Sequence, residues 1–95
     1  GELYVRLGNV YLDGDRFTKA ADSVEKGLKK GGVKRPDQAR LVLGMAYFNL
    51  GEYDKARRAF REAGKDDRSA KYSKQWIAYV TSEEDRQREL EKDIF

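Results

Sequence analysis

Two stretches of the chain, 36 residues apart, follow the same residue pattern. In each, a Leu-Gly pair is followed by Tyr four residues after the leucine and by Ala thirteen residues after it. The residues of the two copies are Leu7-Gly8, Tyr11 and Ala20, and Leu43-Gly44, Tyr47 and Ala56. Apolar residues recur at helical spacing on both sides of a turn in each copy. Each copy therefore predicts a hairpin of two helices, and we expect the copies to stack because one hairpin cannot bury its apolar face alone.

The apolar spacing and the helix breakers between the apolar runs predict five helices and no strand. The expected ranges, in chain order, are 3–12, 15 or 16 to 30, 36–50, 53 to 63 or 64, and 69–91. Gly14 is expected to end the first helix in the left-handed conformation. Pro36 is expected to open the third helix, where its missing N–H costs nothing. Ser69 or Asp67 is expected to cap the last helix.

The last helix is predicted to differ from the others in having two unlike halves. Its first half carries apolar residues such as Tyr72, Trp76 and Val80, whereas Ser82–Glu89 is wholly polar. A helix that packs at one end and is charged at the other is typical of a terminal cap. We therefore expect one domain over residues 1–95, with repeat one at 1–34, repeat two at 37–70 and the capping helix at about 69–92.

The two copies resemble the tetratricopeptide repeat, a helical hairpin of about 34 residues with the pattern W-x₂-L-G-x₂-Y followed by A-x₃-F. Gly8 and Gly44 fit the close approach of the two helices in each hairpin. The chain departs from the pattern at Tyr4 and Arg40, where Trp is usual, and at Val24, where Phe is usual. The resemblance implies an all-α fold: a right-handed superhelix of hairpins, with two repeats and a long C-terminal capping helix.

A second, fainter resemblance concerns the segments Gly31–Asp37 and Asp67–Ile77. Together they are similar to the carboxy-terminal part of bacterial envelope proteins that carry these repeats, some of them associated with TonB-type systems. That resemblance implies a periplasmic location, with the cytoplasm as the alternative. Because the chain begins inside a helical pattern, we also expect it to be a segment of a longer protein.

In the family, the first helix of each repeat lines a concave face that binds proteins or peptides. Residues at positions five, nine, twelve and thirteen of each unit are expected on one stripe of that helix. The candidate groove residues are Val5, Asn9, Leu12 and Asp13, then Leu41, Met45, Phe48 and Asn49, with Tyr72, Gln75 and Tyr79 on the last helix. The apolar members predict a partner site, and the asparagines predict amides that hold a partner's backbone. The alternative, that the last helix or a neighbouring repeat covers Leu41 and Met45, stays open.

The resemblance therefore implies a non-catalytic protein-binding scaffold, and the composition weighs against the other function classes. A subset of the family grips acidic chaperone tails through Lys and Asn at set positions; Asn9 fits, but Val5 and Val42 do not. Self-assembly through the exposed hairpin faces, including a homo-oligomer, remains an alternative. No span of the sequence is apolar enough to predict a membrane helix.

Nucleic-acid binding and catalysis are not expected. The charge is +3 with 39% charged residues of mixed sign, which is typical of a solvated helical surface. Two basic clusters are diluted by nearby acids: Lys29, Lys30, Lys34 and Arg35, and Lys55, Arg57, Arg58 and Arg61. Without His or Cys, histidine-based triads and thiolate or imidazole metal sites are excluded. We therefore expect no enzyme activity, no cofactor and no metal.

Overall fold

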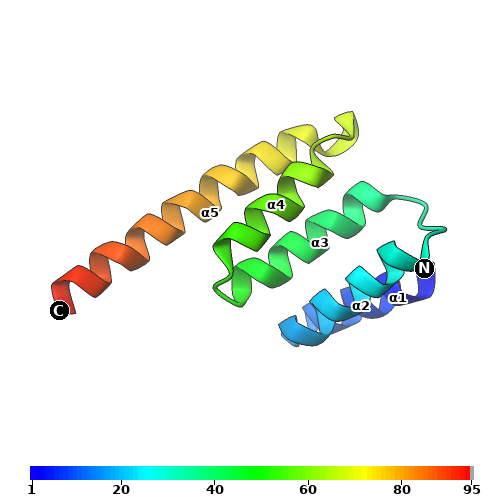
Figure 1. Cartoon of the computed structure of the whole chain (residues 1–95), viewed down its shortest axis with the longest axis horizontal. Helices are drawn as coiled ribbons and strands as arrows, with labels where there is room; N and C mark the ends of the chain where they lie inside the picture. Colours follow the sequence, from blue (N-terminus) through cyan, green and yellow to red (C-terminus); the bar gives the residue numbers. More distant parts are fainter. Residues whose placement is uncertain (95) are drawn as a thin grey trace.

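The computed structural model describes residues 1–94, which form five α-helices and no strand. The helices are α1 (Glu2–Asp13), α2 (Phe17–Lys30), α3 (Pro36–Asn49), α4 (Tyr53–Ala63) and α5 (Asp67–Ile94). Figure 1 shows them stacked in chain order, with α5 at one end and the α1–α2 pair at the other. The all-α prediction is confirmed, and the start of each predicted helix lies within two residues of an observed start.

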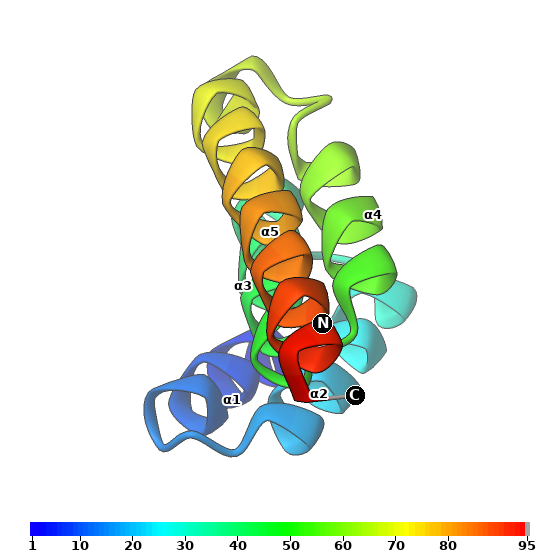
Figure 2. The same cartoon turned by 90° about the vertical axis from the view of Figure 1, so that its left-hand side faces the viewer.

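The helices form two antiparallel hairpins in two layers. α1 packs against α2 and α3 against α4, while α2 contacts α3 and α4 contacts α5. Figure 2 shows α1, α3 and α5 on one side of the molecule and α2 and α4 on the other. We call the first side the first-helix layer and the second side the second-helix layer. The first-helix layer is continuous, because α3 touches both α1 and α5.

Glycine allows close approach of the helices at the same position in both hairpins. A methyl group on Gly44 would lie 2.6 Å from a ring carbon of Phe60, and one on Gly8 would overlap a methyl group of Val24. Real Cβ atoms do not approach other side chains this closely, so the second helix of each hairpin packs where only glycine leaves room. The predicted role of both glycines is confirmed.

Both hairpins turn at residues that adopt the left-handed conformation, but the first turn differs from our prediction. Gly14 has φ −90° at the end of α1, and the positive φ of 59° belongs to Asp15. The prediction for Gly14 is therefore wrong. Asp15 lies 36 residues before Gly51, which has φ 76°. The same hydrogen bonds close both turns, from the Arg16 N–H to the Tyr11 carbonyl at 2.8 Å and from the Glu52 N–H to the Tyr47 carbonyl at 3.0 Å.

Two further segments set helix ends, and each does so in a different way. One lies between the two hairpins and the other lies before α5. Gly31 and Gly32 both have positive φ, and Pro36 stands in the first turn of α3 as predicted. α5 begins at Asp67, two residues before the expected Ser69. The Asp66 carboxylate accepts the backbone N–H of Arg68 at 2.9 Å, so Asp66 satisfies a donor of the first turn. The Ser69 hydroxyl donates to the Asp37 carboxylate instead. Neither of the two predicted caps, Ser69 and Asp67, is therefore the observed one.

The core consists of two hydrophobic clusters. The first joins α1, α2 and α3, together with Ala59 of α4, around small residues such as Ala20, Ala39 and Ala46. The second joins α3, α4 and α5 around Phe60 and Val80, both fully buried. Beyond Glu84 the described residues of α5 are all exposed, so the helix projects from the stack, as Figure 1 shows. This matches the expected cap that packs at one end only.

Candidate partner-binding surface

The predicted groove stripe divides into two sets that face different neighbours. Unit positions five and twelve are buried or half-buried in the two core clusters. Val5 and Leu12 pack in the cluster shared by α1, α2 and α3, whereas Leu41 and Phe48 pack against the cluster that contains α5. Unit positions nine and thirteen, one turn apart, are the more open set. Equivalent residues lie at the same place in each hairpin because the close-approach glycines and the turn residues recur 36 residues apart.

Val5 is not a groove residue. Its side chain is 6% exposed and belongs to the hydrophobic core, so it is closed to a partner. A methyl group on Gly27 would lie 2.9 Å from a Val5 methyl carbon, which shows how tightly α1 and α2 meet there. Leu41, Met45 and Phe48 are half-buried against the cluster that contains α5, which is the covering that the sequence left open as an alternative for Leu41 and Met45.

The remaining residues form an open surface, which we call the first-helix face: Asn9, Asp13, Met45 and Asn49, continued on α5 by Gln75 and Tyr79. Asn9, Asp13 and Asn49 are exposed, and Met45 is half-buried. Each asparagine donates its side-chain amide to the carbonyl four residues earlier, from Asn9 to Val5 at 3.3 Å and from Asn49 to Met45 at 2.8 Å. These bonds use amide hydrogens, and the amide oxygens remain available as acceptors.

An aromatic cluster forms the α5 end of this face. The Phe48 ring lies 5.3 Å from that of Tyr79 and 6.0 Å from that of Trp76, and Trp76 stacks on Phe60 at 5.1 Å. Tyr79 meets Trp76 nearly edge to face, at 79° and 5.9 Å. Tyr79 is nevertheless 50% exposed. Beside it, Gln75, Trp76 and Tyr79 line a hollow of about 220 Å³.

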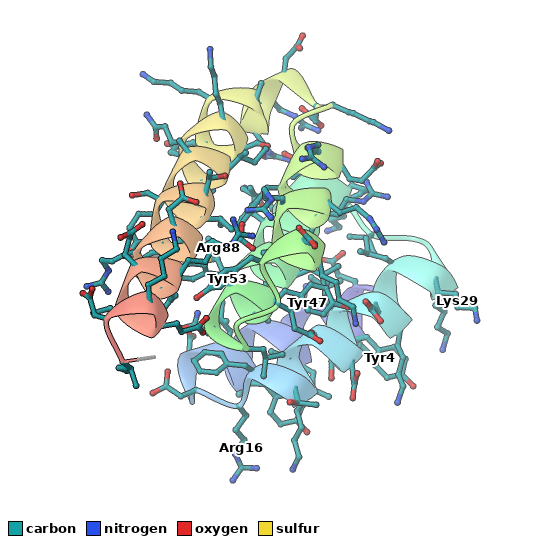
Figure 3. The ribbon with its side chains drawn as sticks, turned by 60° about the vertical axis from the view of Figure 1, so that its left-hand side comes forward. Tyr4, Arg16, Lys29, Tyr47, Tyr53 and Arg88 are labelled. Atoms are coloured by element: carbon teal, nitrogen blue, oxygen red, sulfur yellow. The ribbon has the colours of Figure 1, made fainter. Side chains whose placement is uncertain are left out.

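The sequence analysis missed a cleft of about 360 Å³ between α2 and α4, in the second-helix layer. Its walls carry both signs of charge, including Glu25, Arg40 and Arg58, over Leu43 and other apolar side chains. Tyr47 projects from α3 into this region, and its hydroxyl donates to the Glu25 carboxylate (Figure 3). Burial and that carboxylate raise the Tyr47 pKa. Arg40 in the place of the usual aromatic residue was the sequence signal for this cleft.

The most perturbed carboxyl group lies outside the first-helix face. Asp37 is 2% exposed and accepts two bonds from the Arg35 guanidinium, at 2.6 and 2.9 Å, and one from the Ser69 hydroxyl at 2.6 Å. The Arg35 hydrogen bonds hold the Asp37 pKa well below its usual range. Since Ser69 lies in the first turn of α5 and Asp37 in the first turn of α3, the carboxylate connects these two helices.

The basic clusters are broken up by ion pairs. Arg35 pairs with Asp37, Lys55 with Glu52 at 3.6 Å, and Arg57 with Asp54 and Glu84 at 2.5 and 3.1 Å. Among residues 1–94, no three His, Cys, Asp or Glu side chains are grouped to hold a metal ion. Over the same residues, none of the helices has the length and apolarity needed to cross a bilayer.

Two antiparallel helical hairpins with matching close-approach glycines and matching turns define a helical-repeat protein. The family profile described as tetratricopeptide repeat matches residues 5–70, more than half of the 95 residues, and the chain belongs to that family. Proteins of this family generally mediate protein–protein interaction or scaffolding. No curated protein sequence and no solved structure matches the chain. The fainter resemblance to envelope proteins is not supported by these comparisons.

Proposed function

We propose that this chain is a non-catalytic module that binds a protein or peptide partner on the first-helix face. The face offers exposed amide, carboxylate and aromatic groups from α1, α3 and α5. The family's general role supports a protein partner, and no partner is named by any comparison. Nucleic acid is not expected at this face, because the basic residues listed above lie elsewhere on the chain.

Tyr79 is the observation that carries the proposal. Its ring contacts Phe48 and Trp76, so it is held in place, yet half of its surface meets solvent. An aromatic side chain already ordered by its neighbours loses little conformational entropy on binding and buries a large apolar area. Such residues are enriched among those that dominate binding energy. The adjoining hollow is of a size to receive a partner side chain.

The asparagines complete the proposed recognition. Each amide is oriented by a hydrogen bond to its own helix, which leaves its oxygen able to accept an N–H from an extended partner. Asn9 and Asn49 lie on neighbouring helices, so a partner that spans α1 and α3 can meet both. The partner's backbone would then be held by amides while one of its side chains enters the Tyr79 hollow.

Affinity capture with single arginine substitutions tests the proposal. The tagged chain is incubated with extract from its source organism, and retained proteins are identified by mass spectrometry. Asn49→Arg and Tyr79→Arg should each lower retention of the same protein at least tenfold, because each places a bulky charge on the face. Thr18→Arg adds the same side chain on α2, in the second-helix layer, and should retain that protein as the wild type does. Circular dichroism verifies that all variants stay folded. Equal retention by all of them would exclude the first-helix face as the binding surface.

A further inference from the structure

The cleft between α2 and α4 takes no part in the proposed binding on the first-helix face. It has a volume of about 360 Å³ and is lined by residues of three helices, α2, α3 and α4. Leu28, Leu43 and Ala59 form its apolar part, and the last two are almost fully buried. This volume lies at the lower end of the range of about 300–1,000 Å³ that is usual for small-molecule sites. The cleft therefore has room for a small organic molecule.

Two arginines in the cleft have no acidic partner. Among residues 1–94, no carboxylate oxygen lies within 4.0 Å of the guanidinium of Arg40 or of Arg58. Arg40 is half-buried, so part of its side chain is removed from water without an ion pair in exchange. Both guanidinium groups are therefore open to an anion that enters the cleft.

The carboxylates of the cleft are engaged by other groups. Glu25 accepts the Tyr47 hydroxyl, and Glu62 pairs with Lys65 at 2.9 Å. Three basic and two acidic side chains line the cleft, which leaves one net positive charge. A ligand with a single negative charge matches this balance, whereas a dianion such as a phosphate ester is repelled by the two carboxylates. The charge of the cleft therefore favours a monoanion.

Both arginines are particular to the second hairpin. The residues 36 positions before Arg40 and Arg58 are Tyr4 and Asp22, so neither guanidinium recurs with the repeat. The close-approach glycines and the hydrogen-bonded turns do recur, and the first hairpin forms them without these arginines. Arg40 and Arg58 are therefore not needed for the hairpin fold, and the charge that they bring is a property of the cleft.

We propose that this cleft binds a small organic acid, a molecule with one carboxylate and an apolar body of aromatic or aliphatic carbon. Guanidinium groups pair with carboxylates through two parallel N–H···O bonds, so Arg40 and Arg58 hold the carboxylate. The apolar body lies against Leu28, Leu43 and Ala59, where its burial adds to the affinity.

This site goes beyond the proposed function, because the cleft and the first-helix face have no residue in common. The two proposals fail separately. Tyr79→Arg removes partner binding and leaves the organic-acid site intact, whereas Arg58→Gln removes the organic-acid site and leaves partner retention unchanged.

Backbone amide chemical shifts in two-dimensional NMR measure the binding. Phenylacetate and hexanoate are added at constant ionic strength, each beside its uncharged amide, phenylacetamide or hexanamide. At least one acid should shift the amides of Leu43 and Ala59 with a dissociation constant in the low millimolar range, as its small number of atoms allows. Its amide should bind at least about tenfold more weakly, because it cannot pair with the guanidiniums. No shift with either acid at about 20 mM, or equal binding of acid and amide, overturns the proposal.

Glutamine substitutions test the role of each arginine. Arg40→Gln and Arg58→Gln should each raise the dissociation constant of the acid at least about tenfold and leave binding of the amide unchanged. Arg61→Gln is the matched control, because it removes the same charge from an exposed residue of α4 that does not line the cleft. It should bind the acid as the wild type does. Glu62→Gln should bind the acid more tightly, since it removes a negative charge from the cleft. Equal weakening by Arg58→Gln and Arg61→Gln would assign the effect to overall charge and overturn the proposal.

Arg40→Tyr separates loss of the site from loss of the fold. It copies Tyr4 of the first hairpin, so the variant should keep the helicity and the melting temperature of the wild type in circular dichroism. It replaces a cation by a neutral ring at the wall of the cleft, so binding of the acid should be lost. Binding of the acid by Arg40→Tyr with the affinity of the wild type would show that Arg40 does not hold the carboxylate, and it would overturn the proposal.

Discussion

The two hairpins use the same positions for the same backbone tasks but fill the space between their helices differently. Glycine at the contact of the two helices and a left-handed residue in the turn recur 36 residues apart. At the contact itself, Gly8 faces Val24 in the first hairpin, whereas Gly44 faces the ring of Phe60 in the second. Phe60 then stacks on Trp76 of α5. Phe60 therefore fills the space inside its own hairpin and also contacts the next helix, α5.

The difference shows that two features of a hairpin depend on different residues. One is the close packing of its two helices, and the other is the attachment of the helix that follows. Close approach is set by the glycine and needs only a buried side chain opposite. Attachment of α5 depends on residues that exist only in the second hairpin: Phe60, the buried Asp37 and Arg57, which pairs with Glu84 at 3.1 Å. The first-hairpin equivalent of Asp37 is Gly1, which has no side chain to bind a following helix.

Truncation of the side chain that faces the close-approach glycine should give the largest loss of stability. Phe60→Ala should lower the free energy of unfolding by about 3–5 kcal/mol, because it removes a fully buried ring and its stacking partner for Trp76. Val24→Ala, also fully buried, should cost about 2 kcal/mol because fewer atoms are removed. Chemical denaturation measures both values. Trp76 fluorescence should change at low denaturant in Phe60→Ala only, and equal costs would show that Phe60 has no role beyond its own hairpin.

Removal of the charge of Asp37 should have the next largest effect. Asp37→Asn should lower the free energy of unfolding by about 2 kcal/mol near pH 7, because charge-assisted bonds to Arg35 and Ser69 are weakened. Thermal unfolding followed by circular dichroism measures the loss. Asp67→Asn, an exposed residue at the start of α5, is the matched control and should change stability by less than about 0.5 kcal/mol.

The Asp37→Asn variant should also show how the stability contributed by the Asp37 charge depends on pH. The folded Asp37 pKa is depressed below the unfolded value of about 3.9. The stabilisation from its charge is therefore fully present above that value and is lost as the pH falls toward the folded pKa. The difference in melting temperature between wild type and Asp37→Asn should be constant above about pH 5 and should shrink as the pH falls from about 4 to about 2. A difference that stays constant over this range would show that the charge of Asp37 contributes nothing.

Much of the fold follows from the sequence because the repeat carries two independent signals, helical spacing and breakers at fixed offsets. Pro36 and the Leu-Gly pairs placed α3 and both hairpins correctly. The assignment of Gly14 failed because glycine permits positive φ without requiring it, while the register of the turn put that conformation on Asp15. The start of α5 was placed two residues late because Ser69 turned out to bind a distant carboxylate.

The binding surface was less predictable than the fold. Helical periodicity places residues five, nine, twelve and thirteen of a unit on one broad side, but it does not say where the next helix lies. In the structure Val5 is buried beside Gly27 of α2, whereas Asn9 is open. The cluster around Tyr79 could be located only once α5 was packed on α3, since its rings come from three helices.

Exchange of the turn residues between the hairpins should give the smallest effect. Gly51 has φ 76°, and a Cβ there would meet nothing within 4 Å, so any cost of a side chain is conformational. Gly51→Ala should lower the free energy of unfolding by about 1 kcal/mol, the cost of the left-handed conformation for an L-residue. Gly51→Asp, which copies Asp15 of the first hairpin, should cost about half as much because Asp tolerates that conformation better. Urea titrations of both variants measure the costs. If Gly51→Asp costs as much as Gly51→Ala, the two turns are not interchangeable despite their shared hydrogen bonds, and Asp15 is held at φ 59° by contacts particular to the first hairpin.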